Sequence, residues 1–253
     1  MGRFHFDYRL TIAFDAPVSR HTFLFRFFPG SDATQQLWGV EARLTPAVAL
    51  PTVQDAFGNA CACGHVAGVH DQLSLRVSGE ALLRGGTLPA PLRDAYALPT
   101  ALTQPDAAIR EWLPALPGDP VRAALAASER IHSRVAYRPG VTGDGTTAAQ
   151  ALELGAGVCQ DMAHLLLAAL RSRGLAARYV AGLIPGEGET HAWVEVHDGA
   201  GYVGVDPTRV RLCDDGYLRV NAGRDSRDCA INRGVFLGAA RQTLAVSARM
   251  TEV

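Results

Sequence analysis

The chain has 253 residues, of which 24 are basic and 25 acidic, so its formal net charge is −1. A charge this close to zero creates no global field that would recruit nucleic acid or an anionic membrane, and neither is an expected partner. Hydrophobic residues make up 48% and charged residues 19%, which is typical of a globular protein and excludes disorder. The length fits one large domain or two modest ones.

All 24 basic residues are arginine, because the sequence contains no lysine. A genome-level codon bias explains this more simply than function does. The absence still excludes a lysine Schiff base, a P-loop lysine and a lysine nucleophile within this sequence.

The five cysteines are an odd number at irregular spacing, which argues against a disulfide framework and indicates a reducing compartment. No apolar run reaches the roughly eighteen residues that a membrane helix needs. The segment Met1–Leu10 lacks the apolar core of a signal peptide. These features predict a cytoplasmic protein without membrane contact.

The first hundred residues read as β-structure. Residues Phe4–Ile12 alternate large apolar and polar side chains, as a half-buried strand does. Similar stretches follow at residues 21–28, 40–50, 60–66 and 72–80, separated by glycine- and proline-containing turns. Several short strands at this spacing predict an antiparallel β-sandwich-like domain over residues 1–84.

In the rest of the chain, the spacing of the apolar residues changes. Residues 85–119 are rich in proline and glycine and predict a linker with a short helix. Helical spacing or composition follows at residues 120–137, 147–154 and 159–173, and strand patterns follow at residues 178–184, 191–197 and 202–206. Helices followed by antiparallel strands predict an α+β fold, with a second domain over residues 120–253.

A glycine-containing turn, Gly155–Gly157, leads to Cys159 at the first turn of a helix that is apolar on nearly every side. The unpaired amides and the positive dipole end at a helix N-terminus stabilise a thiolate. The simpler alternative is a buried structural cysteine. The glycine turn and the buried helix favour a nucleophile. Asp161 suits the helix dipole but would oppose the thiolate if it pointed towards it.

A thiolate nucleophile needs a base, and the base needs an orienting group. Residues 191–197 and 202–206 are predicted to pair around a tight hairpin. A turn at residues 198–199 would place His191 directly opposite Asp206, and a turn at residues 199–200 would place Asp206 opposite Trp193 and diagonal to His191. Either loop puts His191 and Asp206 on one face, about 5 to 8 Å apart. A loop of odd length would separate them.

The sequence therefore predicts a triad in which Cys159 attacks, His191 moves the proton and Asp206 orients the imidazole. Gln160 and Trp193 are the predicted substrate-binding residues, although Trp193 could equally shield the triad or serve packing. His164 lies about 140° around the helix from Cys159 and is expected to be structural. His197, near the hairpin tip, is expected at the surface.

Cys61, Cys63 and His65 alternate on one strand face near His70, and thiolates with an imidazole suit zinc. The one-residue gaps are shorter than those of usual structural zinc sites, so packing is favoured over metal binding. Cys213 and Cys229 lack histidine neighbours and are expected to be structural. No metal and no cofactor is predicted.

Three blocks of the sequence resemble the bacterial transglutaminase-like family, whose members are commonly described as cysteine proteases. The blocks are Gly157–Leu165, Thr190–Val196 and Tyr202–Thr208. Residues 223–228 and 233–236 resemble the family's GRDxxD and RGV blocks, and the first eighty residues, including Asp55–Asn59, resemble its N-terminal β domain. The family often has a proline near Ile231 or Asn232, which is absent here.

The resemblance implies a papain-like, transglutaminase-like core with Cys159 as nucleophile, His191 as base and Asp206 as orienting group. The Cys159 amide is the natural first oxyanion donor, while Glu153 stands where papain has a glutamine. Arg224 and Asp225 would line a substrate cleft or, more simply, form a structural ion pair.

The expected partner is a peptide or amide substrate. Hydrolysis is favoured over transamidation because water is always present. Acyl transfer to an amine and a non-catalytic binding module on the same fold are the alternatives. Because the sequence lacks lysine, a lysine amine acceptor would have to come from another molecule.

Overall fold

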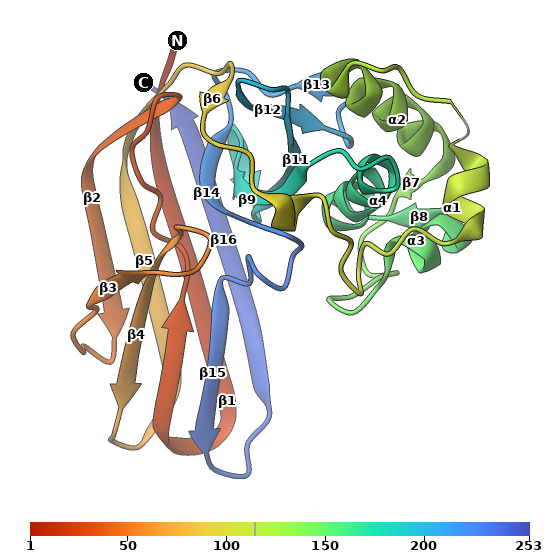
Figure 1. Ribbon diagram of the computed structural model, residues 1–253. Coiled ribbons are helices and arrows are strands. Elements are labelled where there is room, and N and C mark those ends of the chain that lie inside the picture. The colour runs from red at the N-terminus through yellow and green to blue at the C-terminus, as the bar shows by residue number, and fades with distance from the viewer. Residues whose placement is uncertain (114) are drawn as a thin grey trace.

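The computed structural model describes residues 1–113 and 115–253. A long curled sheet lies on one side, a smaller sheet lies beside it, and the helices cover the far face of the smaller sheet (Figure 1). Both termini lie at the same end of the long sheet. No helix in the described ranges is long and apolar enough to cross a membrane.

The long sheet has eight strands, and all its pairings are antiparallel. Its strands are β1 (Gly2–Phe25), β2 (Gln35–Thr45), β3 (Thr52–Gln54), β4 (Ala60–Val66), β5 (His70–Leu83), β10 (Gly186–Gly188), β15 (Asn232–Leu237) and β16 (Gln242–Glu252).

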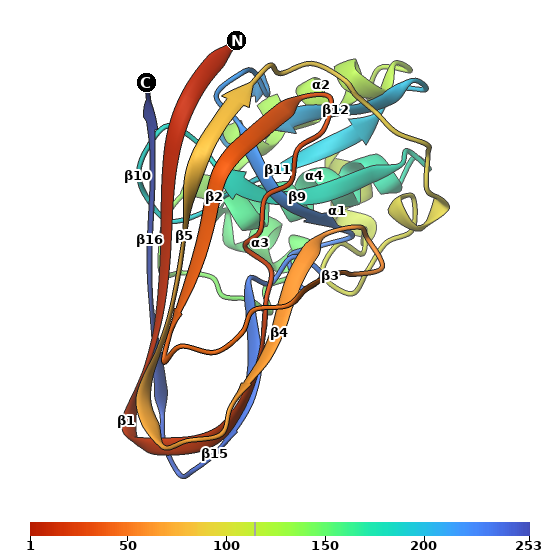
Figure 2. The same ribbon diagram turned by 90° about the vertical axis from the view of Figure 1, so that its left-hand side faces the viewer.

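Strand β1 joins what the sequence pattern separates into two strands. Its first half pairs with β5 and β16, and its second half pairs with β4 and β15, with an irregularity between Ala13 and Val18. The result is one sheet that curls along its length (Figure 2), so the predicted antiparallel arrangement is confirmed, and its strands belong to a single curled sheet. The even-numbered side chains from Phe4 to Phe14 are buried on the face towards the rest of the protein.

The last two strands, β15 and β16, belong to the long sheet. The sequence assigns residues 120–253 to one domain, yet β15 and β16 both return to pair with β1. Strand β10, from the loop before His191, adds to the edge of β16. The pairings with β1 join residues more than two hundred positions apart, and local sequence patterns do not encode such partners.

The smaller sheet is antiparallel and has the order β13-β12-β11-β9-β14, with β6 beside β12. Its strands are β6 (Leu88–Pro89), β9 (Ala177–Leu183), β11 (His191–His197), β12 (Gly201–Asp206), β13 (Arg211–Leu212) and β14 (Leu218–Gly223). The helices are α1 (Ala107–Trp112), α2 (Pro120–Arg134), α3 (Ala148–Leu154) and α4 (Cys159–Arg171).

Helix α4 is the central helix, because its residues from Met162 to Leu170 are all buried. Apolar side chains on every side of α4 contact α2, α3 and the smaller sheet. Asp119 caps α2, and Thr147 with Gln150 forms a capping box on α3. A short parallel pair, β7 (Ala136–Tyr137) and β8 (Ala156–Gly157), fixes the segment that precedes α4.

The predicted linker packs against the smaller sheet and the helices. It contributes β6, the single-turn helix η1 (Asp94–Tyr96) and α1, and it buries Tyr96, Leu102 and Ile109. Its sequence composition indicates the turns, while the burial comes from contacts with β12 and the helices.

Polar contacts join the N-terminal region to the smaller sheet. Glu195 on β11 pairs with Arg219 on β14, and Arg219 pairs with Asp32 of the N-terminal region. The Asn59 side chain donates to the Ala222 carbonyl at 2.8 Å and accepts from the Ala222 amide at 2.8 Å. The Asp55–Asn59 turn is thereby docked onto β14.

Candidate active site

Cys159 is the first residue of α4 and is partly exposed. The Asp161 carboxylate turns back and accepts hydrogen bonds from the Val158 amide at 2.8 Å and from the Thr142 hydroxyl at 2.7 Å. It therefore caps the helix start. A Cβ on Gly157 would lie 2.7 Å from this carboxylate, so the close approach requires glycine there.

The hairpin between β11 and β12 adopts the second of the two predicted registers. The Asp198 amide bonds to the Gly201 carbonyl, and His197 stands opposite Tyr202, so Gly199 and Ala200 form the turn. Continued along the strands, this register puts Asp206 opposite Trp193 and diagonal to His191. Nε2 of His191 lies 2.7 Å from Oδ2 of Asp206.

Asp206 is fully buried and has several hydrogen-bond donors. Besides His191, the Tyr217 hydroxyl donates to Oδ2 at 2.8 Å, and the Thr208 and Arg209 amides donate to Oδ1 at 2.9 and 3.2 Å. Burial alone would raise the pKa of Asp206, but the bond and charge of His191, with the Tyr217 bond, lower it. The group therefore remains a carboxylate.

His191 lies between Asp206 and Cys159. Burial alone would lower the pKa of His191, but hydrogen bonds to Asp206 and to Cys159, together with their charges, raise it to about 9. Because Nε2 faces Asp206, Nδ1 is the ring nitrogen left for Cys159. The structure thus brings the three predicted residues together in the order thiol, imidazole, carboxylate.

Tyr217 is a site residue that the sequence reading missed. It lies in the loop before β14, eleven positions after Asp206, and no spacing rule links the two. Its ring packs edge-on against Trp193, with ring centroids 5.3 Å apart.

The two predicted substrate-binding residues lie in different places. Trp193 is 2% exposed and packs with Tyr217 and Val180 behind His191, where the absent side chain of Gly182 makes room for its ring. This position fits the shielding and packing role that the sequence left open. Gln160 is partly exposed and lines a cavity next to Cys159.

Two adjoining cavities surround the start of α4. The smaller one, about 440 Å³, is lined by Cys159 and His191, by Tyr137 and by β10. The larger one, about 640 Å³, is lined by Gln160 and by residues of β1, β9 and β16. Glu189 and Thr190, just before His191, line both cavities.

The other histidines lie outside the triad. His164 is fully buried on α4, where Nε2 accepts from the Ser226 amide, and burial lowers its pKa to about 4, as expected for a structural residue. His197 is 9% exposed, and the prediction that it lies at the surface is wrong. The segment containing β6 covers it, and Nε2 of His197 lies 3.1 Å from the Ala90 carbonyl.

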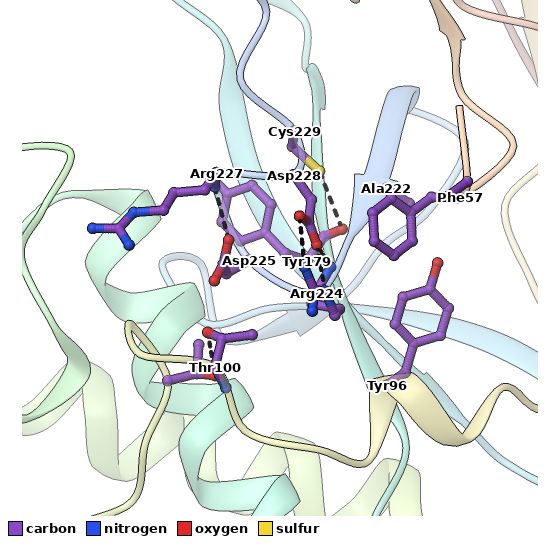
Figure 3. A network of polar contacts seen from close by, with 12 residues as sticks. Phe57, Tyr96, Thr100, Tyr179, Ala222, Arg224, Asp225, Arg227, Asp228 and Cys229 are labelled. Atoms are coloured by element: carbon purple, nitrogen blue, oxygen red, sulfur yellow. Dashed lines mark hydrogen bonds and ion pairs between the residues drawn. The ribbon is translucent and has the colours of Figure 1, made fainter. Parts of the chain in front are cut away.

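The Arg224 region forms a structural network (Figure 3). Arg224 pairs with Asp228, with Nε 2.8 Å from Oδ2, and its guanidinium lies over the Phe57 ring. The expected pair between Arg224 and Asp225 is therefore replaced by this one. Asp225 is buried and accepts from the Arg227 amide instead.

All five cysteines are free. Burial raises the pKa of Cys61, Cys213 and Cys229, while Cys63 is exposed on β4. Among residues 1–113 and 115–253, no three histidine, cysteine or acidic side chains gather as metal ligands would.

Comparisons with known proteins agree with this architecture. Residues 111–207 match the model of the transglutaminase-like superfamily, and residues 4–81 match that of the bacterial transglutaminase-like N-terminal region. An uncharacterized protein of Mycobacterium tuberculosis is 32% identical over 226 residues, with 73% of this chain and 71% of that protein covered. An uncharacterized protein of Mycobacterium leprae is 35% identical over 145 residues, with 53% of this chain and about half of that protein, 52%, covered.

Among solved structures, a “putative cysteine protease” from Cytophaga hutchinsonii superposes with a TM-score of 0.79 at 21% identity. The superposition covers 100% of this chain and 91% of the other, and it shows a shared fold. The chain belongs to the transglutaminase-like superfamily and carries the N-terminal region of the bacterial branch.

Proposed function

We propose that the protein is a thiol-dependent acyl-transfer enzyme that hydrolyses a peptide or amide bond through a thioester on Cys159. The observation that supports this most directly is the 2.7 Å contact between His191 Nε2 and Asp206 Oδ2. It fixes the imidazole so that Nδ1 is the nitrogen available to Cys159. Nucleophile, base and orienting group are the three parts that such chemistry requires.

In the first half-reaction the Cys159 thiolate attacks the amide carbonyl carbon and forms a C–S bond. The carbonyl π electrons move to oxygen and give a tetrahedral oxyanion. His191, whose pKa of about 9 keeps it protonated at neutral pH, gives its proton to the leaving nitrogen. The C–N bond then breaks, the amine departs and a thioester remains.

In the second half-reaction water attacks the thioester carbonyl while His191 accepts a proton from it. The C–S bond breaks, the carboxylic acid leaves and the Cys159 thiolate is restored beside protonated His191. Asp206 stays ionised throughout and stabilises the imidazolium.

Two groups are suited to stabilise the oxyanion. The Cys159 backbone amide belongs to the first turn of α4, where amides have no partner within the helix. The Tyr137 side chain lines the same cavity as Cys159, and burial together with the charges of Cys159 and Glu189 raises its pKa. Its hydroxyl therefore keeps its proton and is our candidate for the second donor.

The proposal is tested with a library of peptide and isopeptide amides, using wild type and Cys159→Ala. We expect an acyl mass increase on Cys159 in the wild type and none in the variant. Turnover in ¹⁸O-labelled water with an added primary amine then separates the acceptors. Label in the product acid indicates hydrolysis, whereas a new amide indicates transamidation. No thioester with any acyl donor would favour a non-catalytic binding module.

A further inference from the structure

The larger cavity, next to Gln160, is lined by residues of both the long sheet and the smaller sheet. The long sheet contributes Tyr8 and Leu10 from β1 and Leu244 and Val246 from β16, and the smaller sheet contributes Tyr179 from β9. Its volume of about 640 Å³ is in the range of ligand sites, and it meets the Cys159 cavity at Glu189 and Thr190. A molecule that lies across Cys159 can thus continue into it.

Two buried tyrosines line this cavity. Tyr8 is 1% exposed and Tyr179 is 4% exposed, and both side chains line the cavity. Burial and the Glu189 charge raise the pKa of Tyr8, and burial and the Cys159 charge raise that of Tyr179. Both hydroxyls are therefore proton donors at neutral pH.

The part of the cavity wall that β1 and β16 form next to Tyr8 is apolar, while Glu189, Arg227 and Arg233 add charged groups to the lining. Leu10 and Val246 stand opposite each other on β1 and β16, and Leu244 follows on the same face of β16. A lining that combines an apolar wall with polar groups suits a peptide, which offers carbonyl acceptors along its backbone and side chains for the apolar wall.

We propose that this cavity binds a polypeptide segment of the substrate on one side of the scissile amide, with the hydroxyls of Tyr8 and Tyr179 donating to its carbonyl oxygens. The inference rests on the proposed function and narrows its substrate class to extended polypeptides. It also assigns the long sheet a part in substrate binding, because Tyr8, Leu10 and Leu244 all belong to that sheet.

The test uses peptide vinyl sulfones, which alkylate a catalytic thiol without turnover. A single-residue probe is compared with two probes that carry three further residues, on the amino side or on the leaving-group side of the electrophile. We expect one of the two extensions to raise kinact/KI at least tenfold in the wild type. Leu244→Trp, which fills the cavity, should abolish that gain. Tyr8→Phe and Tyr179→Phe should each raise KI about fivefold, with kinact unchanged.

The matched control is Ala245→Trp, because successive residues of a strand point to opposite faces and Ala245 is exposed. This variant should keep the preference for the extended probe. Equal rates for all three probes in the wild type, or an extension gain that survives Leu244→Trp, would overturn the inference while leaving the proposed function intact. If no probe modifies Cys159, this inference is overturned, and the thioester experiment then decides whether the proposed function fails as well.

Discussion

The Tyr217 hydroxyl donates a 2.8 Å hydrogen bond to Oδ2 of Asp206, the same oxygen that lies 2.7 Å from Nε2 of His191. One carboxylate oxygen thus serves both the base and a tyrosine from a different element. The two backbone amides on Oδ1 hold the other side of the carboxylate. Asp206 therefore has a fixed orientation before any substrate binds.

Tyr217→Phe should lower kcat about tenfold and leave KM nearly unchanged. The variant removes a hydrogen bond to a buried charge, a loss on the order of 1.5 kcal/mol, and the Asp206 carboxylate that orients His191 is then less firmly held. Steady-state kinetics on any substrate found by the library screen measures the effect. A change in KM alone would show that Tyr217 acts on substrate binding instead.

The rate of thioester formation should fall as the pH rises through about 9. The pKa of His191 is raised above its ordinary 6.5, so the imidazolium that protonates the leaving amine persists up to that pH and is lost above it. The same shift stabilises the folded state fully below pH 6.5 and progressively less as the pH approaches 9. Asp206→Asn should move the alkaline limb of the rate profile to lower pH. An unmoved limb would exclude His191 as its origin.

Glu195→Gln should cost about 3 kcal/mol of unfolding free energy at pH 7, measured by urea denaturation. Burial would raise the pKa of Glu195, but Arg178 and Arg219 lower it from 4.5 to about 2. Because the folded-state pKa is depressed, this stability is present above pH 4.5 and is lost as the pH falls towards 2. The exposed pair of Glu41 with Arg43 provides the control, since Glu41→Gln should change stability little at either pH.

Gly157→Ala should slow alkylation of Cys159 several-fold. The added Cβ would lie 2.7 Å from Oδ2 of Asp161, so the carboxylate that accepts from Val158 and Thr142 must move. The first turn of α4, which carries the thiol, then loses its cap. Gly145→Ala is a suitable control, because a Cβ there meets no atom within 4 Å. Equal slowing in both variants would contradict the explanation.

Much of the site follows from local sequence patterns. The apolar helix predicts the position of Cys159, and the period of two along paired strands places His191 and Asp206 on one face once the hairpin loop is even. Both steps use residues close together in the chain. The choice between the two even registers depends on the turn, which the Asp198–Gly201 backbone contact identifies as Gly199-Ala200.

The parts that the sequence did not reveal depend on long-range contacts. Tyr217 reaches Asp206 from the loop before β14, through a contact that no local sequence pattern indicates. Strands β15 and β16 pair with β1, more than two hundred residues earlier in the chain, and no local pattern indicates that partner. His197 looked exposed because its covering segment lies about a hundred residues earlier in the chain.

The most direct test of the triad is the alkylation rate of Cys159 by iodoacetamide at pH 7, followed by peptide mass spectrometry in wild type and His191→Ala. Cys63 is exposed on β4, away from the triad, and serves as an internal control in both proteins. We predict that Cys159 in the wild type reacts faster than Cys63, and that His191→Ala slows Cys159 at least tenfold without changing Cys63. If Cys159 reacts equally fast in both proteins, His191 does not activate it and the triad is wrong.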